Sequence, residues 1–465
     1  MTADDRIGLM LERARRYAAA GEDEAAKHAL LEVLLLDPAS LPALTAIGAL
    51  ALASGHRSAA RTAFVQAVRL HPGDPTARVG LGTILAEDGD LAAARLHFQA
   101  ALSVDAGFAP AHQGLARLLT ELGKPGAEAH WQQGFAGHAV VKQRYRGPAP
   151  GVPLLLLVSA RGGNLATRPW IDDRVFAVTA IYADFHDPAQ PLPPHALAVN
   201  AIGDADTGGR ALACAEAILA GSSAPLVNPP AQVRRTGREA QALRLGGIPG
   251  VVAPRILRLK RAALPAAEEL GFPLLLRAPG FHTGQHCVRV ERRADLLQAA
   301  ASLPGDEVLA IEYLDARGAD GLARKYRVMI IDGVLYPLHL AISPDWKVHY
   351  FTAGMAAEAA HREEERRFLD DMPAVLGDRA MAALTGIAAA MGLDYAGVDF
   401  ALGPDGCVLL FEANAAMAIV APDQDLIWDY RRAAVAAVQD AARRMLVRRA
   451  GVRSELIGGC WPGGR

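Results

Sequence analysis

The sequence is poor in cysteine and in lysine. Its 465 residues include four cysteines, too few and too widely spaced for a disulfide framework or a Cys-x-x-Cys metal site: Cys214, Cys287, Cys407 and Cys460. Only six of its 48 basic residues are lysines, and the other 42 are arginines. A site that commonly uses lysine is therefore expected to hold arginine in this chain.

The sequence also lacks an excess of positive charge and a long apolar run. The net charge is −2 and the isoelectric point is about 6.7. The composition therefore lacks the excess of basic residues that is typical of proteins that bind nucleic acid or an anionic membrane. Residues 40–55 contain a proline and two glycines, and the most apolar run, residues 152–158, has the length of a strand. Neither reaches the roughly 20 apolar residues of a spanning helix. The first five residues are acidic where a secretory signal is basic, so we expect a cytoplasmic protein.

What the chain does contain is apolar residues in quantity. Hydrophobic residues make up 51% of the sequence and the mean hydropathy is +0.14. This composition excludes an intrinsically disordered chain. At a typical size of about 150 residues per domain, the length predicts about three domains.

The N-terminal third repeats with a period of 34 residues. Five columns carry the period: Gly21, Gly55, Gly89 and Gly123; Pro38, Pro72 and Ala106; Ala26, Ala60 and Ala94; Leu30, Phe64 and Phe98; Gly48, Gly82 and Ala116. Each unit is read as two short amphipathic helices, separated by a glycine that can adopt the left-handed conformation and ended by the proline.

This pattern resembles the tetratricopeptide repeat (TPR) over residues 7–108, followed by a degraded fourth unit in which Glu128 and Gln132 replace the small and aromatic columns. The prediction is a helical solenoid of about 3.5 repeats in residues 1–142, capped by the fourth unit. Such arrays offer a groove to a peptide or protein partner. The alternative is that the array only packs on a neighbouring domain or forms a dimer.

Residues 143–151 are rich in proline and glycine and are predicted to be a linker. Apolar runs that alternate with a helix then predict a small α/β domain over residues 152–224. Its first strand, residues 154–158, is followed by the loop Ser159–Asn164 and an expected helix start. We interpret this loop as a plain turn, with a phosphate or carboxylate nest as the alternative; it lacks the spacing of a dinucleotide-binding loop.

Near the C-terminus, residues 397–402 and 407–412 read as two strands joined by a Gly-Pro-Asp-Gly turn. Centring the turn on residues 404 and 405 places Asp399 opposite Leu410 and diagonal to Glu412, with Asn414 on the same face. Carboxylates are costly to bury in apolar strands unless they are paired or bind metal. Two carboxylates and an amide oxygen are ligands that Mg²⁺ prefers. A surface hairpin with incidental acids is the alternative.

The acidic set after the predicted helix 378–391 resembles the ATP-grasp superfamily, of the glutathione synthetase and RimK ligase kind. The resemblance covers residues 225–450, with residues 152–224 as the pre-ATP-grasp domain and 451–465 as a flexible tail. The implied fold class is a multidomain α plus α/β chain: a TPR solenoid, a pre-ATP-grasp α/β domain and an ATP-grasp domain.

The resemblance also implies roles for upstream residues. The strand Pro273–Arg277 holds Arg277 where the family has lysine, and a glycine-rich flap follows it. Arg238, with Arg235 as its competitor, matches the basic residue on the α-phosphate, and Arg327 matches the arginine on the transferred phosphate. Together the implied nucleotide contacts and catalytic residues are Arg238, Arg277, Gly280, His282, Gly284, Glu312, Tyr313, Leu314 and Arg327.

The segment from Tyr336 to Tyr350 is rich in functional side chains and is expected to form two strands that enter the site. Its candidates for contact with the acceptor substrate are His339, Ser343, Lys347 and His349. A purely structural role in the core is the alternative. The charged segment His361–Asp371 is expected to be a solvated helix face.

The family resemblance implies an ATP-dependent carboxylate–amine ligase that works through an acyl phosphate, with ATP and two Mg²⁺ ions (or Mn²⁺) on Asp399, Glu412 and Asn414. The substrates would be a small-molecule or peptide carboxylate and an amine, and the TPR array would recruit a peptide or protein. The alternative is a non-catalytic TPR scaffold whose second part is a nucleotide-binding pseudo-ligase, because Arg277 replaces the usual lysine. The sequence leaves open whether the chain forms a homo-oligomer.

Overall fold

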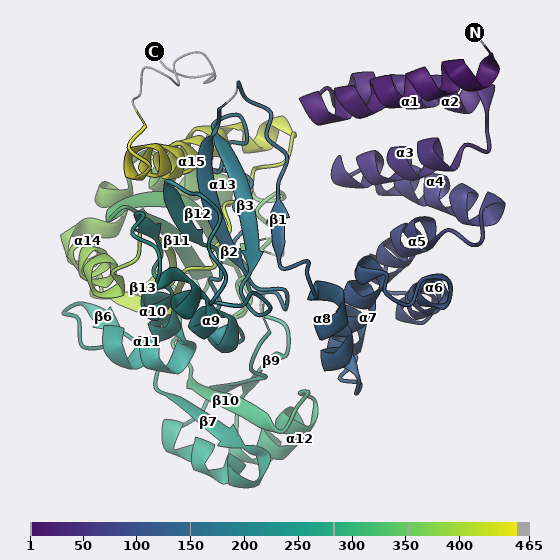
Figure 1. Cartoon of the computed structure of the whole chain (residues 1–465). Coiled ribbons are helices and arrows are strands. Elements are labelled where there is room, and N and C mark those ends of the chain that lie inside the picture. Colours follow the sequence, from purple (N-terminus) through teal and green to yellow (C-terminus); the bar gives the residue numbers. More distant parts are fainter. Residues whose placement is uncertain (1, 149, 282–283, 351–352, 453–465) are drawn as a thin grey trace. The chain divides into compact units, whose positions relative to one another are not determined.

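The computed structural model describes residues 2–148, 150–281, 284–350 and 353–452. His282 and most of the predicted tail, residues 453–465, therefore lie outside the described residues. The chain divides into two compact units, Met1–Ala149 and Pro150–Arg465 (Figure 1). Each unit is described by itself.

The described part of the N-terminal unit is built from helices that pack as consecutive antiparallel pairs, each pair being one repeat. The bounds are α1 (Ala3–Ala20), α2 (Asp23–Leu36), α3 (Leu41–Ala53), α4 (Arg57–Leu70), α5 (Pro75–Glu87), α6 (Leu91–Val104), α7 (Ala109–Glu121) and α8 (Ala127–Phe135), followed by the short strand β1 (Val140–Lys142). The glycines of the first column all have positive φ, from 59° to 86°, and lie between the two helices of a pair. The expected repeat architecture is confirmed.

A Gly–Phe contact explains two of the repeat columns. The ring of Phe64 on α4 lies where a Cβ on Gly48 of α3 would be, at 2.9 Å, and where a Cβ on Gly80 of α5 would be, at 2.4 Å. Phe98 on α6 makes the same contacts, at 2.9 Å with Gly82 and at 2.6 Å with Gly114. The aromatic side chain of each second helix thus fits between its own first helix and that of the next repeat.

The C-terminal unit begins with parallel strands in the order β3-β2-β4-β5. These are β2 (Val152–Val158), β3 (Phe176–Tyr182), β4 (Leu197–Asn200) and β5 (Leu226–Val227), with α9 (Gly209–Leu219) before β5. Leu155 and Leu157 enter one core cluster, and Leu154 and Leu156 enter another. Burial on both faces explains the uninterrupted apolar run. The helix expected after Ser159–Asn164 is wrong: residues 159–175 form turns.

A second, antiparallel sheet has the order β7-β10-β8-β9 and its own core. Its strands are β7 (Ile256–Lys260), β8 (Leu274–Arg277), β9 (Cys287–Val290) and β10 (Glu307–Glu312), and it carries the 3₁₀ helices η2 (Arg261–Leu270) and η3 (Arg293–Asp295) and the helix α12 (Leu296–Ala301). Arg277 ends β8 and is paired with Cys287 at the start of β9. The loop between these strands is the predicted flap.

The third sheet has the order β12-β11-β13-β14-β6. Its strands are β6 (Val251–Val252), β11 (Ala323–Ile331), β12 (Val334–Ser343), β13 (Tyr395–Leu402) and β14 (Val408–Asn414). The helices of this region are α10 (Pro230–Val233), α11 (Arg238–Leu245), α13 (Ala359–Asp370), α14 (Met372–Met391) and α15 (Asp429–Arg449), with the 3₁₀ helices η1 (Arg234–Thr236) and η5 (Leu426–Trp428).

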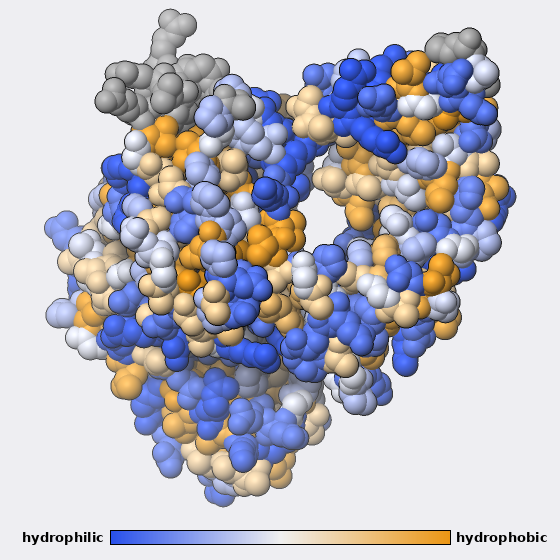
Figure 2. All heavy atoms as spheres, viewed as in Figure 1, coloured by the Kyte–Doolittle hydropathy of each residue, from blue (hydrophilic) through white to orange (hydrophobic). Residues whose placement is uncertain are grey.

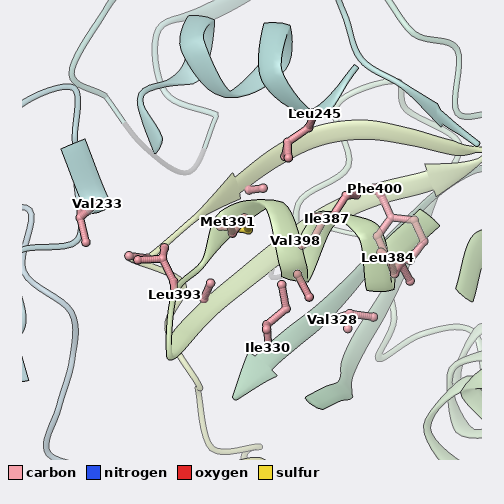
Figure 3. Packing of buried hydrophobic residues seen from close by; sticks show 14 of the residues in the cluster. Val233, Leu245, Val328, Ile330, Leu384, Ile387, Met391, Leu393, Val398 and Phe400 are labelled. Atoms are coloured by element: carbon pink, nitrogen blue, oxygen red, sulfur yellow. The ribbon is translucent and has the colours of Figure 1, made fainter. Parts of the chain in front are cut away.

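Helix α14 covers one face of the third sheet. Figure 3 shows its side chains Leu384 and Ile387 packed near Val328 of β11 and Phe400 of β13, all of them fully buried. The helix is interrupted at Gly377, whose φ is 76°, so its regular part begins at Asp378 as the sequence predicts. By length and composition α14 could cross a membrane. Its packing in this core is that of an internal helix, and hydrophilic residues surround the small apolar areas on the face shown in Figure 2.

The predicted register of the C-terminal hairpin is wrong by one residue. The structure pairs Phe400 with Leu410 and Asp399 directly with Glu412. The loop centres on Asp405, because Gly406 adopts a φ of 74° and Gly403 bonds to Cys407 across the turn, and the register shifts once more between Asp399 and Phe400. The two carboxylates are therefore cross-strand neighbours rather than diagonal ones.

Two further expectations need correction. Residues 347–349 do not continue as a strand after β12, so the segment that ends at Tyr350 is a strand followed by a loop. On α13, Glu365 is 0% exposed, so the expectation of a solvated face is wrong at this residue. Of the remaining charged residues of α13, Arg362 and Glu364 are half-buried and the others are exposed, which explains why composition alone suggests a fully exposed helix.

Candidate active site

The acidic set lies on the sheet face opposite α14. Along β11 and β13, Val328, Val398 and Phe400 point toward α14, so Arg327 and Asp399 point to the other face. Farther along that face, Met329 and Ile331 pack under α15. The polar side chains thus occupy the end of a face whose other end is apolar core.

Asp399 is the most strongly held acid of the site. It is 4% exposed, and Arg327 donates to both of its oxygens, with Nε–Oδ1 at 2.6 Å and Nη2–Oδ2 at 2.8 Å. Lys325 Nζ lies 3.3 Å from Oδ2. Burial opposes ionisation of Asp399, but the two cations outweigh it and hold the pKa of Asp399 well below its ordinary value. The carboxylate is charged at neutral pH.

Glu412 and Asn414 lie beside Asp399 on β14. Arg238 Nη2 donates to Glu412 Oε1 at 2.8 Å, and Asn414 Nδ2 donates to the same oxygen at 2.8 Å. Asn414 Oδ1 accepts from the backbone of Ala416. Arg235, the competitor of Arg238, instead faces Gln232 on the surface. The structure therefore brings Arg238 to the site and leaves Arg235 outside it.

Arg277 approaches Glu412 and Arg238 from β8. Its guanidinium donates to the carbonyl of Phe281 in the flap. Burial, followed by the repulsion of Arg238, lowers the pKa of Arg277. Gly280 and Gly284 both have positive φ, of 80° and 72°. The described part of the flap thus has glycines where left-handed backbone is required.

The structure does not bring the predicted nucleotide contacts Glu312, Tyr313 and Leu314 to a described cavity. Glu312 ends β10 and accepts from the backbone N–H of Arg255 at 2.9 Å. The ring of Tyr313 lies under the guanidinium of Arg289, 4.3 Å from its centre. Neither residue, nor Leu314, lines a described cavity.

The first cavity lies between the second and third sheets. It has a volume of about 40 Å³ and is lined by apolar residues at one side, among them Pro254, Ile256, Leu309 and Leu410, and by polar residues at the other: Asp204, Asp206, Arg238, Arg277, Glu412 and Asn414. Small-molecule sites commonly measure about 300–1,000 Å³. The first cavity is therefore well below that range in this structure.

A second cavity, of about 390 Å³, lies on the other side of Arg327 and Lys325. His339 and His349, both predicted substrate contacts, line it together with Tyr350, Trp428 and Arg431. Ser343 and Lys347 do not: Ser343 bonds to the backbone of Asp345, and Lys347 Nζ bonds to the carbonyl of Cys287 near the flap. The structure therefore separates the four predicted substrate residues into two places.

Sequence reasoning missed Lys325, Glu365 and Arg431. Lys325 could have been found, because it lies two residues from Arg327 on one strand and therefore on the same face. Glu365 and Arg431 lie on different helices, α13 and α15, and no spacing rule joins them. Arg431 Nε is 3.2 Å from Glu365 Oε1, and Tyr430 donates to Glu365 Oε2 at 2.5 Å.

The loop Ser159–Asn164 is a structural turn. Asn164 bonds to both backbone groups of Ser159, and the backbone N–H of Ala160 donates to Asp184. An amide already bonded to a carboxylate is a poor anion site. Among the described residues, no group of three or more His, Cys, Asp or Glu side chains could hold a metal; the candidate set has two carboxylates and one amide.

Comparison with known proteins agrees with this architecture. The tetratricopeptide repeat model matches residues 45–111. No curated protein sequence matches the chain. Among solved structures, MamA 41-end from Desulfovibrio magneticus RS-1 is 21% identical over 28% of this chain and 74% of its own, with a TM-score of 0.26.

Two similar structures cover the C-terminal unit. The RimK domain protein ATP-grasp from Sphaerobacter thermophilus DSM 20745 is 20% identical over 64% of this chain and 99% of its own, with a TM-score of 0.41. The D-alanine–D-alanine ligase from Bacillus anthracis is 16% identical over 64% and 97%, with a TM-score of 0.42. The chain thus combines a TPR region with a unit of mixed α/β sheets.

Proposed function

We propose that the C-terminal unit is an ATP-dependent carboxylate–amine ligase and that the first cavity is its nucleotide site. The observation that carries the proposal is the set of the buried Asp399 and the half-buried Glu412 and Asn414 on neighbouring strands. Arg238, Arg277 and Arg327 face this set from three other elements. Holding several charged side chains close together away from water costs free energy unless they are paired or serve a function. They match the requirements of phosphoryl transfer, in which positioning and charge neutralisation supply most of the catalysis.

In the proposed reaction, a substrate carboxylate oxygen attacks the γ-phosphorus of ATP and ADP leaves. An amine then attacks the acyl carbon, phosphate leaves, and an amide forms after loss of a proton. Arg277 and Arg238 would hold phosphate oxygens in the first cavity. Arg327, which lines the second cavity and bonds to Asp399, would hold the transferred group where the carboxylate meets it.

The donor set fits Mg²⁺, because Asp399 and Glu412 supply carboxylate oxygens and Asn414 an amide oxygen. The amide of Asn414 would have to turn, since its Nδ2 now faces Glu412. When bound, Mg²⁺ would neutralise phosphate charge during transfer. These three residues would hold the metal, and Arg238 would exchange Glu412 for a phosphate oxygen.

The test is ADP release by the purified full chain with ATP, Mg²⁺ and pools of carboxylates and amines. We expect slow ADP release that such a pool stimulates, and a loss of about 100-fold or more in Glu412→Gln, because a charge that acts at the transferring phosphate is removed. Glu239→Gln, an exposed acid on α11, is the matched control. Unchanged ADP release in Glu412→Gln would show that the ligase proposal is wrong.

The same measurement decides the alternative of a nucleotide-binding pseudo-ligase. Two observations favour it: Arg277 replaces the usual lysine, and the first cavity is small. Under this alternative the protein binds ADP with a measurable affinity but releases none from ATP with any substrate pool. Binding without turnover would therefore replace the ligase proposal.

We also propose that the TPR array recruits a peptide or protein, as substrate or as pathway partner. Support comes from the repeat itself, since stacked helix pairs present an extended surface. Affinity purification of the full chain, compared with a chain lacking residues 1–142, tests this. The proposal fails if no protein is enriched by the full chain and lost with the truncation.

A further inference from the structure

The second cavity carries a net positive lining. Three cationic side chains line it, Lys325 and Arg327 from β11 and Arg431 from α15. Their acidic partners, Asp399 and Glu365, are buried behind them and do not line the cavity. Among the described lining residues the one carboxylate is Asp423, which is exposed. The lining therefore favours an anion.

The cations lie in two groups on different elements. Lys325 and Arg327 share Asp399 on the sheet, next to the proposed site of phosphoryl transfer. Arg431 belongs to α15, is 5% exposed, and stacks over the ring of Tyr350 at 4.2 Å. Stacking fixes the plane of the guanidinium, and a fixed guanidinium suits the geometry of a carboxylate.

His339 adds a polar atom without a partner. The residue is 6% exposed and lines the cavity, and its Nδ1 has no hydrogen-bond partner among the described residues. Burial, followed by the nearby Arg327, lowers the pKa of His339 well below its ordinary value, so the ring is neutral. His339 on β12 is the cross-strand neighbour of Arg327, and its ring lies 4.7 Å from that of Tyr350, over which Arg431 stacks. Because this nitrogen is itself buried, the neutral ring forms part of the cavity wall and adds no charge to it.

We propose that the second cavity binds the carboxylate substrate of the ligase and selects a small diacid. One carboxylate would lie at Lys325 and Arg327, where it is activated, and Arg431 would bind the second, with His339 between them. The volume of about 390 Å³ lies in the range of small-molecule sites. Arg431 is then the specificity-determining residue. This inference rests on the proposed function for its chemistry, but its test measures binding alone.

The experiment is calorimetric titration of the full chain with succinate, glutarate and adipate. Each diacid is compared with the monoacid of equal carbon number: butyrate, pentanoate and hexanoate. We expect at least one diacid to bind about ten-fold or more tightly than its monoacid, the value of one charged hydrogen bond. If no diacid binds more tightly than its monoacid, the inference is wrong.

The double variant Arg431→Gln with Glu365→Gln removes both members of the buried pair without leaving a lone charge. We expect it to lose the diacid preference, whereas Arg431→Lys keeps part of it. Arg444→Gln, an exposed arginine farther along α15 that does not line the cavity, is the control that keeps the preference in full. ADP affinity, measured in parallel, should be unchanged in all variants. Retention of the preference in the double variant would overturn the role of Arg431.

The two proposals fail differently. If the protein prefers diacids but releases no ADP from ATP, the second cavity is still a diacid site and the ligase proposal is wrong. ADP release stimulated equally by mono- and diacids would keep the ligase and remove the inference.

Discussion

At the residue scale, the position where this chain departs from its family resemblance is Arg277. The guanidinium is partly buried and donates to the carbonyl of Phe281 in the flap. A lysine could supply the same positive charge, but its three N–H donors radiate from one nitrogen and do not form the planar fork of a guanidinium. For nucleotide binding, we expect the positive charge at this position to matter more than the planar, forked shape of the guanidinium.

We therefore expect Arg277→Met to weaken ADP binding by about 10- to 100-fold, the range of a lost charged hydrogen bond. Arg277→Lys should stay within a few-fold of the parent protein. Both affinities are measured by calorimetric titration with Mg²⁺ present. Arg293→Met removes an exposed arginine from the same sheet region and serves as the control. Equal affinity in Arg277→Met and the parent would show that Arg277 does not contact the nucleotide.

Glu365 predicts a pH dependence of stability. Burial raises its pKa from 4.5 to about 7, although Arg431 opposes the shift. Between these values the folded protein binds more protons than the unfolded one, so the free energy of unfolding falls as pH rises through this range, by about 3 kcal/mol at most. Glu365→Gln should remove this fall, and Glu363→Gln, an exposed acid on the same helix, should retain it. Urea unfolding of the full chains at about pH 5 and pH 7.5 measures the difference. An identical pH dependence in Glu365→Gln and the parent would contradict the assignment.

At the scale of elements, the repeat depends on glycines that admit an aromatic ring. A Cβ on Gly80 would lie 2.4 Å from Phe64, and that ring cannot move away because Gly48 confines its other side. We expect Gly80→Ala to destabilise the protein by about 1–3 kcal/mol through overpacking. A Cβ added to Gly8 of α1 would meet no atom within 4 Å, so Gly8→Ala should stabilise by about 0.5–1 kcal/mol. In thermal unfolding we expect Gly80→Ala to lower the midpoint temperature and Gly8→Ala to raise it. If both variants shifted the midpoint in the same direction, the packing argument would be wrong.

The same scale shows what could be read from the sequence. The sequence reveals the repeat because the contact of Phe64 with two glycines occurs again 34 residues later, at Phe98. The same residue types therefore recur at the same spacing. The alternation of side chains predicts the strands around Asp399 but not their register, because the turn at the left-handed Gly406 and the irregularity after Asp399 each move the pairing by one residue. The sequence could not reveal the pairing of Glu365 with Arg431, because the contact joins two helices and the two residues are 66 positions apart in the chain.

At the scale of the whole molecule, the chain consists of two compact units joined near residues 143–151. Units with separate cores are expected to unfold in separate transitions. Only the C-terminal unit contains the proposed nucleotide site, and a ligand stabilises the unit that binds it. Calorimetry of the full chain should therefore show two transitions, of which ADP with Mg²⁺ raises one. A joint shift of both transitions would contradict independent units.

The pairing of Glu412 with Arg238 has a consequence for the order in which ligands arrive. The acids of the proposed metal site already have internal counter-ions: Arg238 for Glu412, and Arg327 with Lys325 for Asp399. A lone cation must compete with these basic side chains, and a lone phosphate must compete with the carboxylates. When metal and nucleotide enter together, the carboxylates can bind the metal while their former basic partners bind the phosphate oxygens. No carboxylate or phosphate is then left without a counter-ion. Each acid of the site thus has a counter-ion before any ligand arrives, so metal and nucleotide are expected to bind as one unit.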